Sequence, residues 1–206
     1  MPFKALHKWV SRLTILTLAT LGALAGCGGN NTQPEPTVRL NERQITAVAR
    51  DANQAEVDQG NYALTQVTEG PVRDFAQRMV QEHQMALQRM AQLVAAAEEN
   101  DVSRQLQAQA NSVFDRLRNP GANDFSLVYM CGQLVLHQRV LQVIDNRLVP
   151  DATTEPLRSL ITDMRSTVLM HRDQARQILD QIINTQDDNG RNNACVRAGF
   201  DPYIAD

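Results

Sequence analysis

Four ionisable residues stand singly in four separate segments whose other regularly spaced residues are apolar: Glu56, His83, His137 and His171. Imidazole nitrogens and carboxylate oxygens are ligands for transition-metal ions. Buried among apolar neighbours, each would cost several kcal/mol unless it met a charge, a hydrogen bond or a metal ion. The four residues therefore predict one shared polar site, which either binds a metal ion or forms a buried hydrogen-bond network.

The elements that must position these residues are amphipathic helices. In each segment the apolar residues recur at steps of three and four, with one step skipped in the first segment, and this spacing aligns them on one helix face. The four stripes are Ile45, Ala49, Ala52, Glu56, Ala63 and Val67; Val72, Ala76, Met79, His83, Ala86, Met90, Leu93 and Ala97; Leu127, Met130, Leu134, His137, Leu141, Ile144 and Leu148; and Leu157, Ile161, Met164, Val168, His171, Ala175, Ile178 and Ile182. Each ionisable residue thus lies on the face that its helix is expected to bury.

Composition favours helices throughout. Aromatic residues make up only 4% of the chain, and the helix formers Ala, Leu, Gln, Glu, Arg and Met dominate residues 40–185. Helix breakers fall between the stripes, at Gly70-Pro71, Asn100-Asp101, Asn119-Pro120-Gly121 and Val149-Pro150-Asp151. A shorter apolar pattern over residues 102–117 predicts a linking helix. The predicted fold is all-α: an antiparallel four-helix bundle over residues 40–185 with this extra helix, followed by a polar tail over 186–206.

The positions of the four residues relative to the turns predict that they meet. Glu56 precedes Glu69 by almost the same stretch of chain as that by which His83 follows it. Thr154 lies midway between His137 and His171. At a rise of about 1.5 Å per residue, both pairs fall near the middle of their hairpins. Two hairpins packed as a bundle would gather the four side chains at one height in the core.

The segment 1–26 predicts a secretory signal peptide. Three basic residues precede an apolar run over 13–24, and the segment contains no acidic residue. The run ends in Leu24-Ala25-Gly26-Cys27, which resembles the lipobox of bacterial lipoproteins, cut before the cysteine that then carries the lipid. An ordinary signal peptide with a chance Cys27 is the alternative.

The residues after Cys27 predict a destination and a tether. Gly28 stands where an inner-membrane retention signal usually has Asp, so the resemblance implies an outer-membrane anchor with the domain in the periplasm. Residues 27–39 are expected to form a lipid-anchored flexible linker, because 28–37 are rich in Gly, Asn and Pro. Three of the 20 Lys and Arg residues fall in the signal peptide, so the remaining chain has a net charge of −6. That charge disfavours a nucleic-acid partner. An envelope protein partner remains open.

Two further cysteines remain after lipidation, Cys131 in the third stripe segment and Cys195 in the tail. In an oxidising compartment such a pair predicts a disulfide that would pin the tail to the bundle. Two free thiols are the alternative. Neither cysteine is needed as a metal ligand, because Cys131 lies on a different helix face from His137.

Several strings of residues resemble the ferritin-like bacterial envelope family known as domain of unknown function 4142. They are Ala52-Asn53-Gln54-Ala55-Glu56-Val57 with Gly60, Ala63 and Leu64; Val72-Arg73-Asp74-Phe75-Ala76 and Met79-Val80-Gln81-Glu82-His83; Phe125 and Tyr129; and His171 with Ala175. The chain departs from the family pattern at Ser126, where the family usually has Asp, and at Met164-Arg165, where it often has Leu-Pro. The resemblance implies a ferritin-like four-helix bundle in the cell envelope and no settled activity.

A ferritin-like fold suggests di-iron chemistry, but the ligands do not fit it. Di-iron bundles use a Glu three residues before His on two helices. Here Val80 precedes His83 and Val168 precedes His171 at that spacing, so ferroxidase or iron-storage activity is disfavoured. No nucleophile motif, phosphate loop or carboxylate dyad supports another enzymatic activity, and whether the chain is an enzyme stays open.

Three imidazoles and one carboxylate instead predict a site for a single zinc, copper, iron or manganese ion. If all four side chains bind, the site is closed and structural; if Glu56 orients a water, the site is open to chemistry. The expected role is metal handling or envelope stress. The competing interpretation is a metal-free structural or interaction protein of the envelope, in which Glu56 pairs with a protonated histidine.

Other polar and sulfur-containing residues near the stripes are given lesser roles. Met79, Met130 and Met164 share the stripes and are expected to fill the core, although they could contact copper(I). Residues Asp74, Arg78 and Glu82 lie off the stripe and are assigned to a solvated face. Asp145 and Asp163 are weak candidates for orienting a ligand from behind.

Overall fold

The computed structural model describes residues 38–93 and 96–201, apart from the side chain of Leu93. The predicted signal peptide, the lipidation site Cys27 and most of the predicted linker lie outside these residues. The elements are α1 (Glu42–Gln66), α2 (Pro71–Leu93), α3 (Asp101–Arg118), α4 (Phe125–Val143), the π-helix η1 (Ile144–Leu148), α5 (Val149–Asp151), α6 (Glu155–Ile183) and α7 (Asp188–Arg197). Over the described residues all regular structure is helical, which confirms the all-α prediction. None of these helices combines the length and apolar content that crossing a bilayer requires.

Local signals in the sequence set several helix ends. Asn41 caps α1, because its side chain accepts a hydrogen bond from the Gln44 N–H while the Gln44 side chain accepts from the Asn41 N–H. Asn100 and Ser103 form the same reciprocal cap at the start of α3. Gly70 adopts φ +84° before α2, a conformation that suits glycine. The predicted boundaries at these points follow from this chemistry.

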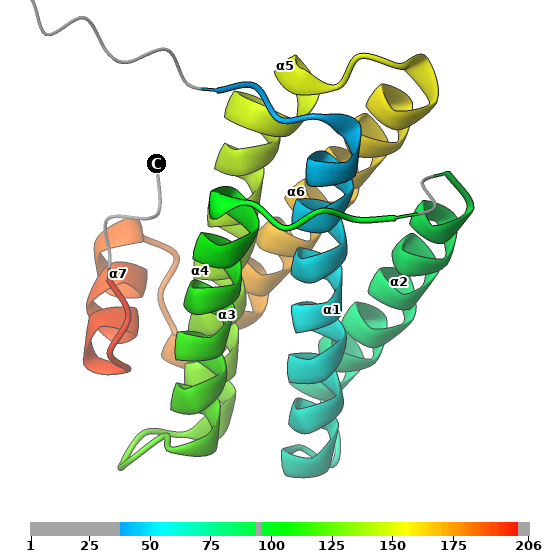
Figure 1. Ribbon diagram of the computed structural model, residues 1–206. Helices are drawn as coiled ribbons and strands as arrows, with labels where there is room; N and C mark the ends of the chain where they lie inside the picture. The colour runs from blue at the N-terminus through cyan, green and yellow to red at the C-terminus, as the bar shows by residue number, and fades with distance from the viewer. Residues whose placement is uncertain (1–37, 94–95, 202–206) are drawn as a thin grey trace, which may run out of the picture. The chain divides into compact units, whose positions relative to one another are not determined.

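The long helices pair as two antiparallel hairpins, α1 with α2 and α4 with α6 (Figure 1). The linking helix α3 packs against α1 and α4, and α2 packs against α6. Helix α4 runs through η1 into α5, so Pro150 lies in its final turn and the chain turns only at 152–154. Thr154 then precedes α6, as the turn centre chosen from the sequence requires.

The hydrophobic core consists of two clusters separated by the predicted site residues. The aromatic cluster contains Phe75 and Tyr129, and the aliphatic cluster contains Ile45 and Ile161. On α6, for example, Val168 belongs to the aliphatic cluster and Ala175 to the aromatic cluster, with His171 between them. On α1 the two clusters follow in the same order along the chain, and on α2 and α4 they follow in the reverse order, with the site residue between them in each case. A layer of buried polar side chains therefore crosses the core.

The segment predicted as a polar tail contains α7, which packs against α4 and α6. A disulfide joins Cys195 of α7 to Cys131 of α4, with the two Cα atoms 5.4 Å apart. Arg191 is only 4% exposed and pairs with Asp180 of α6. Phe200 completes the attachment by packing into the aromatic cluster. These contacts cover the back of α4.

Candidate metal centre

Three histidines from three helices meet in the polar layer. His83 on α2, His137 on α4 and His171 on α6 are 6%, 2% and 0% exposed, and their ring centroids lie 5.2 to 6.0 Å apart. One nitrogen of each ring lies within 4.8 Å of the corresponding nitrogens of the other two. The hairpin geometry predicted from the sequence thus brings these residues together.

The orientation of the His83 ring is set by Asn53 of α1. His83 Nδ1 lies 2.8 Å from Asn53 Oδ1. The Asn53 amide nitrogen donates to the Ala49 carbonyl at 2.6 Å, which leaves its oxygen facing the imidazole. Because an amide oxygen only accepts, Nδ1 must carry the proton, and the lone pair of neutral His83 lies on Nε2.

The other two rings are oriented in the same way by different acceptors. His137 Nδ1 donates to the Gln133 backbone carbonyl at 2.8 Å, which leaves its lone pair on Nε2. His171 Nε2 lies 2.8 Å from Glu82 Oε2, and donation to this carboxylate leaves its lone pair on Nδ1.

The three remaining nitrogens, His83 Nε2, His137 Nε2 and His171 Nδ1, are buried and have no hydrogen-bond partner. Three imidazole nitrogens that each carry a lone pair and no proton cannot hydrogen-bond to one another. A metal ion would satisfy all three at once, and histidine ligands of metals typically donate their other N–H to a carbonyl or carboxylate as seen here. The donor set therefore fits a transition-metal ion.

Burial disfavours the protonated forms of His83 and His171. It lowers the pKa of His83 well below the ordinary value, and the neighbouring His137 and His171 lower it further. Burial, followed by His137, lowers the pKa of His171 to about 4, although the hydrogen bond to Glu82 acts in the opposite direction. A metal ligand must be deprotonated, so both shifts favour metal binding.

Glu56, the fourth predicted residue, lies at the edge of the three-histidine cluster. Its Oε1 is 3.8 Å from His137 Nδ1, the nitrogen already bonded to the Gln133 carbonyl, and its Oε2 has no partner. Burial raises the pKa of Glu56, while His137 and the Gln133 side chain oppose this rise. The residue lines a small cavity of about 20 Å³ together with His83, His137 and Met164.

The assignment of Glu82 to a solvated face is wrong, and the role of Asn53 was missed. Glu82 is 29% exposed at its side chain and holds the His171 ring across the α2/α6 boundary. The residue before His83 points sideways, toward the neighbouring helix, which an argument limited to one stripe overlooks. Asn53 precedes Glu56 by three residues and so shares its face of α1.

The remaining polar candidates are placed clearly. Asp74 and Arg78 are exposed, as expected, although the charge of Arg78 also lowers the pKa of His171. Asp145 pairs with Arg165, and both side chains are more than 40% exposed, so it does not orient a histidine. Asp163 lines a cleft that borders His83.

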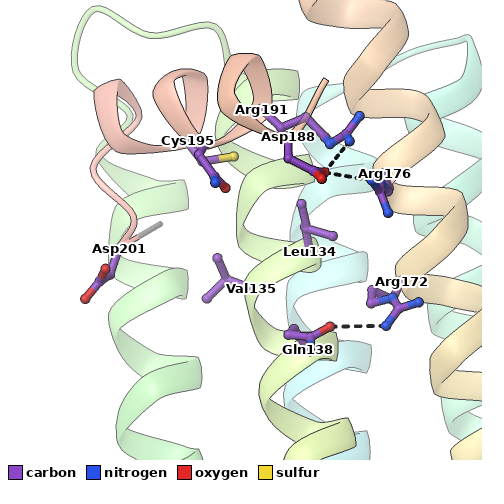
Figure 2. Close-up of a pocket in the computed structure, with 10 residues that line it drawn as sticks. Leu134, Val135, Gln138, Arg172, Arg176, Asp188, Arg191, Cys195 and Asp201 are labelled. Atoms are coloured by element: carbon purple, nitrogen blue, oxygen red, sulfur yellow. Dashed lines mark hydrogen bonds and ion pairs between the residues drawn. The ribbon is translucent and has the colours of Figure 1, made fainter. Parts of the chain in front are cut away.

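A second cavity, of about 120 Å³, lies between α4, α6 and α7 beside Cys195 (Figure 2). Its arginines are already paired within the protein. Arg176 and Arg191 both contact Asp188, and Arg172 contacts Gln138. The contact between Arg176 and Asp188 joins α6 to α7.

The fold and the site define an all-helical protein with a buried three-histidine cluster. Residues 28–178 match the family described as domain of unknown function (DUF4142), and the chain belongs to this family. The resemblance to domain of unknown function 4142 is thereby confirmed. No curated protein and no solved structure is detectably similar to the chain.

Proposed function

We propose that the protein binds one transition-metal ion between α2, α4 and α6 through His83 Nε2, His137 Nε2 and His171 Nδ1. The observation that carries this proposal is the set of three buried, unpartnered nitrogens, each left free by a hydrogen bond on the opposite side of its ring. Rings held in this way already present the tautomers that a metal ion requires.

Three histidine ligands leave a tetrahedral ion with one further position. Glu56 is the candidate for that position or for orienting a water there, since it lines the same small cavity. Zinc, copper and iron suit three imidazoles, and the carboxylate also suits manganese. The role that follows is metal handling or a response to envelope stress.

Two further parts of the proposal concern the whole chain. We infer a ferritin-like four-helix bundle, a view supported by two antiparallel hairpins whose ionisable residues meet in the core.

We also infer a lipoprotein held by Cys27 in the outer membrane and facing the periplasm, which rests on the signal sequence and on Gly28. Globomycin, which blocks lipoprotein signal cleavage, should lead to accumulation of the uncut precursor; an unchanged mature product would contradict the anchor.

A metal-free envelope protein with a buried Glu/His network is the alternative. It requires a proton shared among the inward nitrogens, yet burial lowers the pKa of both His83 and His171. Glu56 would have to pair with His137, whose nearer nitrogen already donates to Gln133. These observations favour the metal site.

The test is elemental analysis of the chain purified from envelopes without a histidine tag. Wild type is expected to carry close to one metal ion per chain, His137→Ala to lose it, and Gln138→Ala, altered at the next residue of α4, to keep it. Absence of metal from wild type, with none taken up from zinc, copper, iron or manganese, would support the metal-free alternative.

A further inference from the structure

A cleft between α2 and α6 borders the histidine site. This α2/α6 cleft has a volume of about 210 Å³, and its walls include Glu82 and Ala86 of α2 and Asp163 and Thr167 of α6. It is more than ten times the volume of the small cavity that Glu56 lines. The cleft is therefore large enough for a partly hydrated ion.

The cleft and the small cavity share four of the residues that line them. Asn53, His83, Met164 and Val168 line both of them. His83 is 94% buried, and its Nε2, one of the three unpartnered nitrogens, has no other group to satisfy it. His83 lines the cleft and has a buried nitrogen without a hydrogen-bond partner. This combination points to a ligand that reaches the nitrogen through the cleft.

Charge along the cleft favours a cation. Glu82 and Asp163 face it from opposite helices, against the single guanidinium of Arg89. Glu82 also accepts the hydrogen bond of His171, so it joins the cleft to a second ligand. Carboxylates lining a narrow approach raise the local concentration of cations and the rate at which they associate.

We propose that the metal ion enters and leaves through the α2/α6 cleft, drawn inward by Asp163 and Glu82. This inference rests on the metal-binding function proposed above and deepens it. An ion with such a route exchanges with its surroundings, so the site takes up and releases metal as cargo and is not a closed structural site.

The experiment measures zinc uptake by stopped-flow mixing and zinc release to a chelating dye, using the purified full chain in detergent. Ala86→Phe places an aromatic ring in the cleft. It is expected to slow uptake and release equally, by about tenfold or more, and to leave the dissociation constant unchanged. Gln105→Phe, which fills the separate groove between α3 and α4, is the matched control and should leave both rates as in wild type.

A variant that removes a charge from the cleft and hardly changes the shape of the side chain tests the route independently. Asp163→Asn should lower the association rate several-fold at low salt, with the difference fading as salt is added. Asp74→Asn removes an equal charge from an exposed position on α2 and should have little effect. Thr167→Phe repeats the obstruction from α6 if Ala86→Phe fails to fold.

The outcomes separate the two proposals. Wild-type rates in every obstruction variant that folds, together with an unaltered rate in Asp163→Asn, would overturn the route while the metal site stands. A wild-type chain that binds no zinc, copper, iron or manganese would overturn the metal site and the route together.

Discussion

The two apolar clusters on either side of the histidine layer are built differently. The aromatic cluster holds Phe75 and Tyr129, and it is tied to α7 by the disulfide. Phe75 lies edge-on to both His137 and His171, with ring centroids 6.5 Å apart in each case. The aliphatic cluster contains no aromatic residue among its members and supplies Met164 and Val168 to the α2/α6 cleft. The aromatic side packs edge-on against two of the histidine rings, and the aliphatic side borders the cleft through which we propose that the ion enters.

The largest expected effect comes from breaking the aromatic side. Phe75→Ala should lower the free energy of unfolding by about 3 to 5 kcal/mol, because it leaves a cavity at a fully buried position. It should also weaken metal binding, since two ligand rings lose their support. Ile161→Ala, at an equally buried aliphatic position, should cost about 2 to 5 kcal/mol but leave metal affinity nearly unchanged. Urea unfolding and zinc titration of both variants measure this contrast, and equal losses of affinity would refute it.

Reduction of the disulfide is expected to have the next largest effect. Its cysteines are 64 residues apart, and releasing them should lower the free energy of unfolding by roughly 2 to 4 kcal/mol. Because α7 packs behind α4, zinc affinity should change little. Unfolding with and without reductant, alongside a Cys131→Ser, Cys195→Ser chain that should no longer respond to reductant, tests this. A large loss of zinc on reduction would show that the attachment of α7 also positions His137.

A smaller effect is expected at the polar contact on the aliphatic side. Asn53→Leu removes the acceptor of His83 and should weaken zinc binding by about 10- to 100-fold. Asn53→Asp restores an oxygen acceptor and should recover most of this loss. Competition with a chelator of known affinity measures both, and equal affinities in the two variants would mean that packing, and not the hydrogen bond, orients His83.

The smallest effect concerns acid and the metal-free chain. The folded-state pKa values of His83 and His171 lie below that of an exposed histidine, so the unfolded chain binds protons first as pH falls. The stability of the metal-free chain should therefore fall as the pH drops from about 6.5 toward 4. The raised pKa of Glu56 acts in the opposite direction. Unfolding at pH 7 and pH 5 measures the sum, and His171→Gln should reduce it; a wild-type chain equally stable at both values would contradict it.

The stripes of apolar residues predicted much of this architecture. Where they predict burial wrongly, the position in the helix or the packing of other helices explains the difference. Residues Leu157 to Ile178 of the fourth stripe are buried as expected, but Ile182 is 38% exposed near the end of α6. On α4 the stripe underestimates burial, because α3 and α7 cover residues such as Val128 and Gly132. The sequence predicted a linking helix and a tail pinned by a disulfide, but the stripe does not indicate which residues of α4 these segments cover.

The sequence predicted those features of the site that depend on residue spacing within the helices and turns. The helix spacing and the turns set the height of each histidine within its own hairpin, and packing the two hairpins as a bundle then brings the three together. The residues that orient the rings depend on contacts between helices. Glu82 reaches His171 across 89 positions of sequence, and the Asn53 contact requires α1 and α2 to pack at one particular height. Those contacts become visible only when the helices are assembled.

The polar layer also bears on how the protein unfolds. A continuous core usually makes a small domain unfold as a single cooperative unit, whereas weakly connected parts open separately. Here the apolar contacts are interrupted at the level of the histidines, and an ion bound there would join α2, α4 and α6 where the core does not. Amide hydrogen exchange would then report two units of different protection without the ion and one with it. The ion would thus determine the folding cooperativity of the domain.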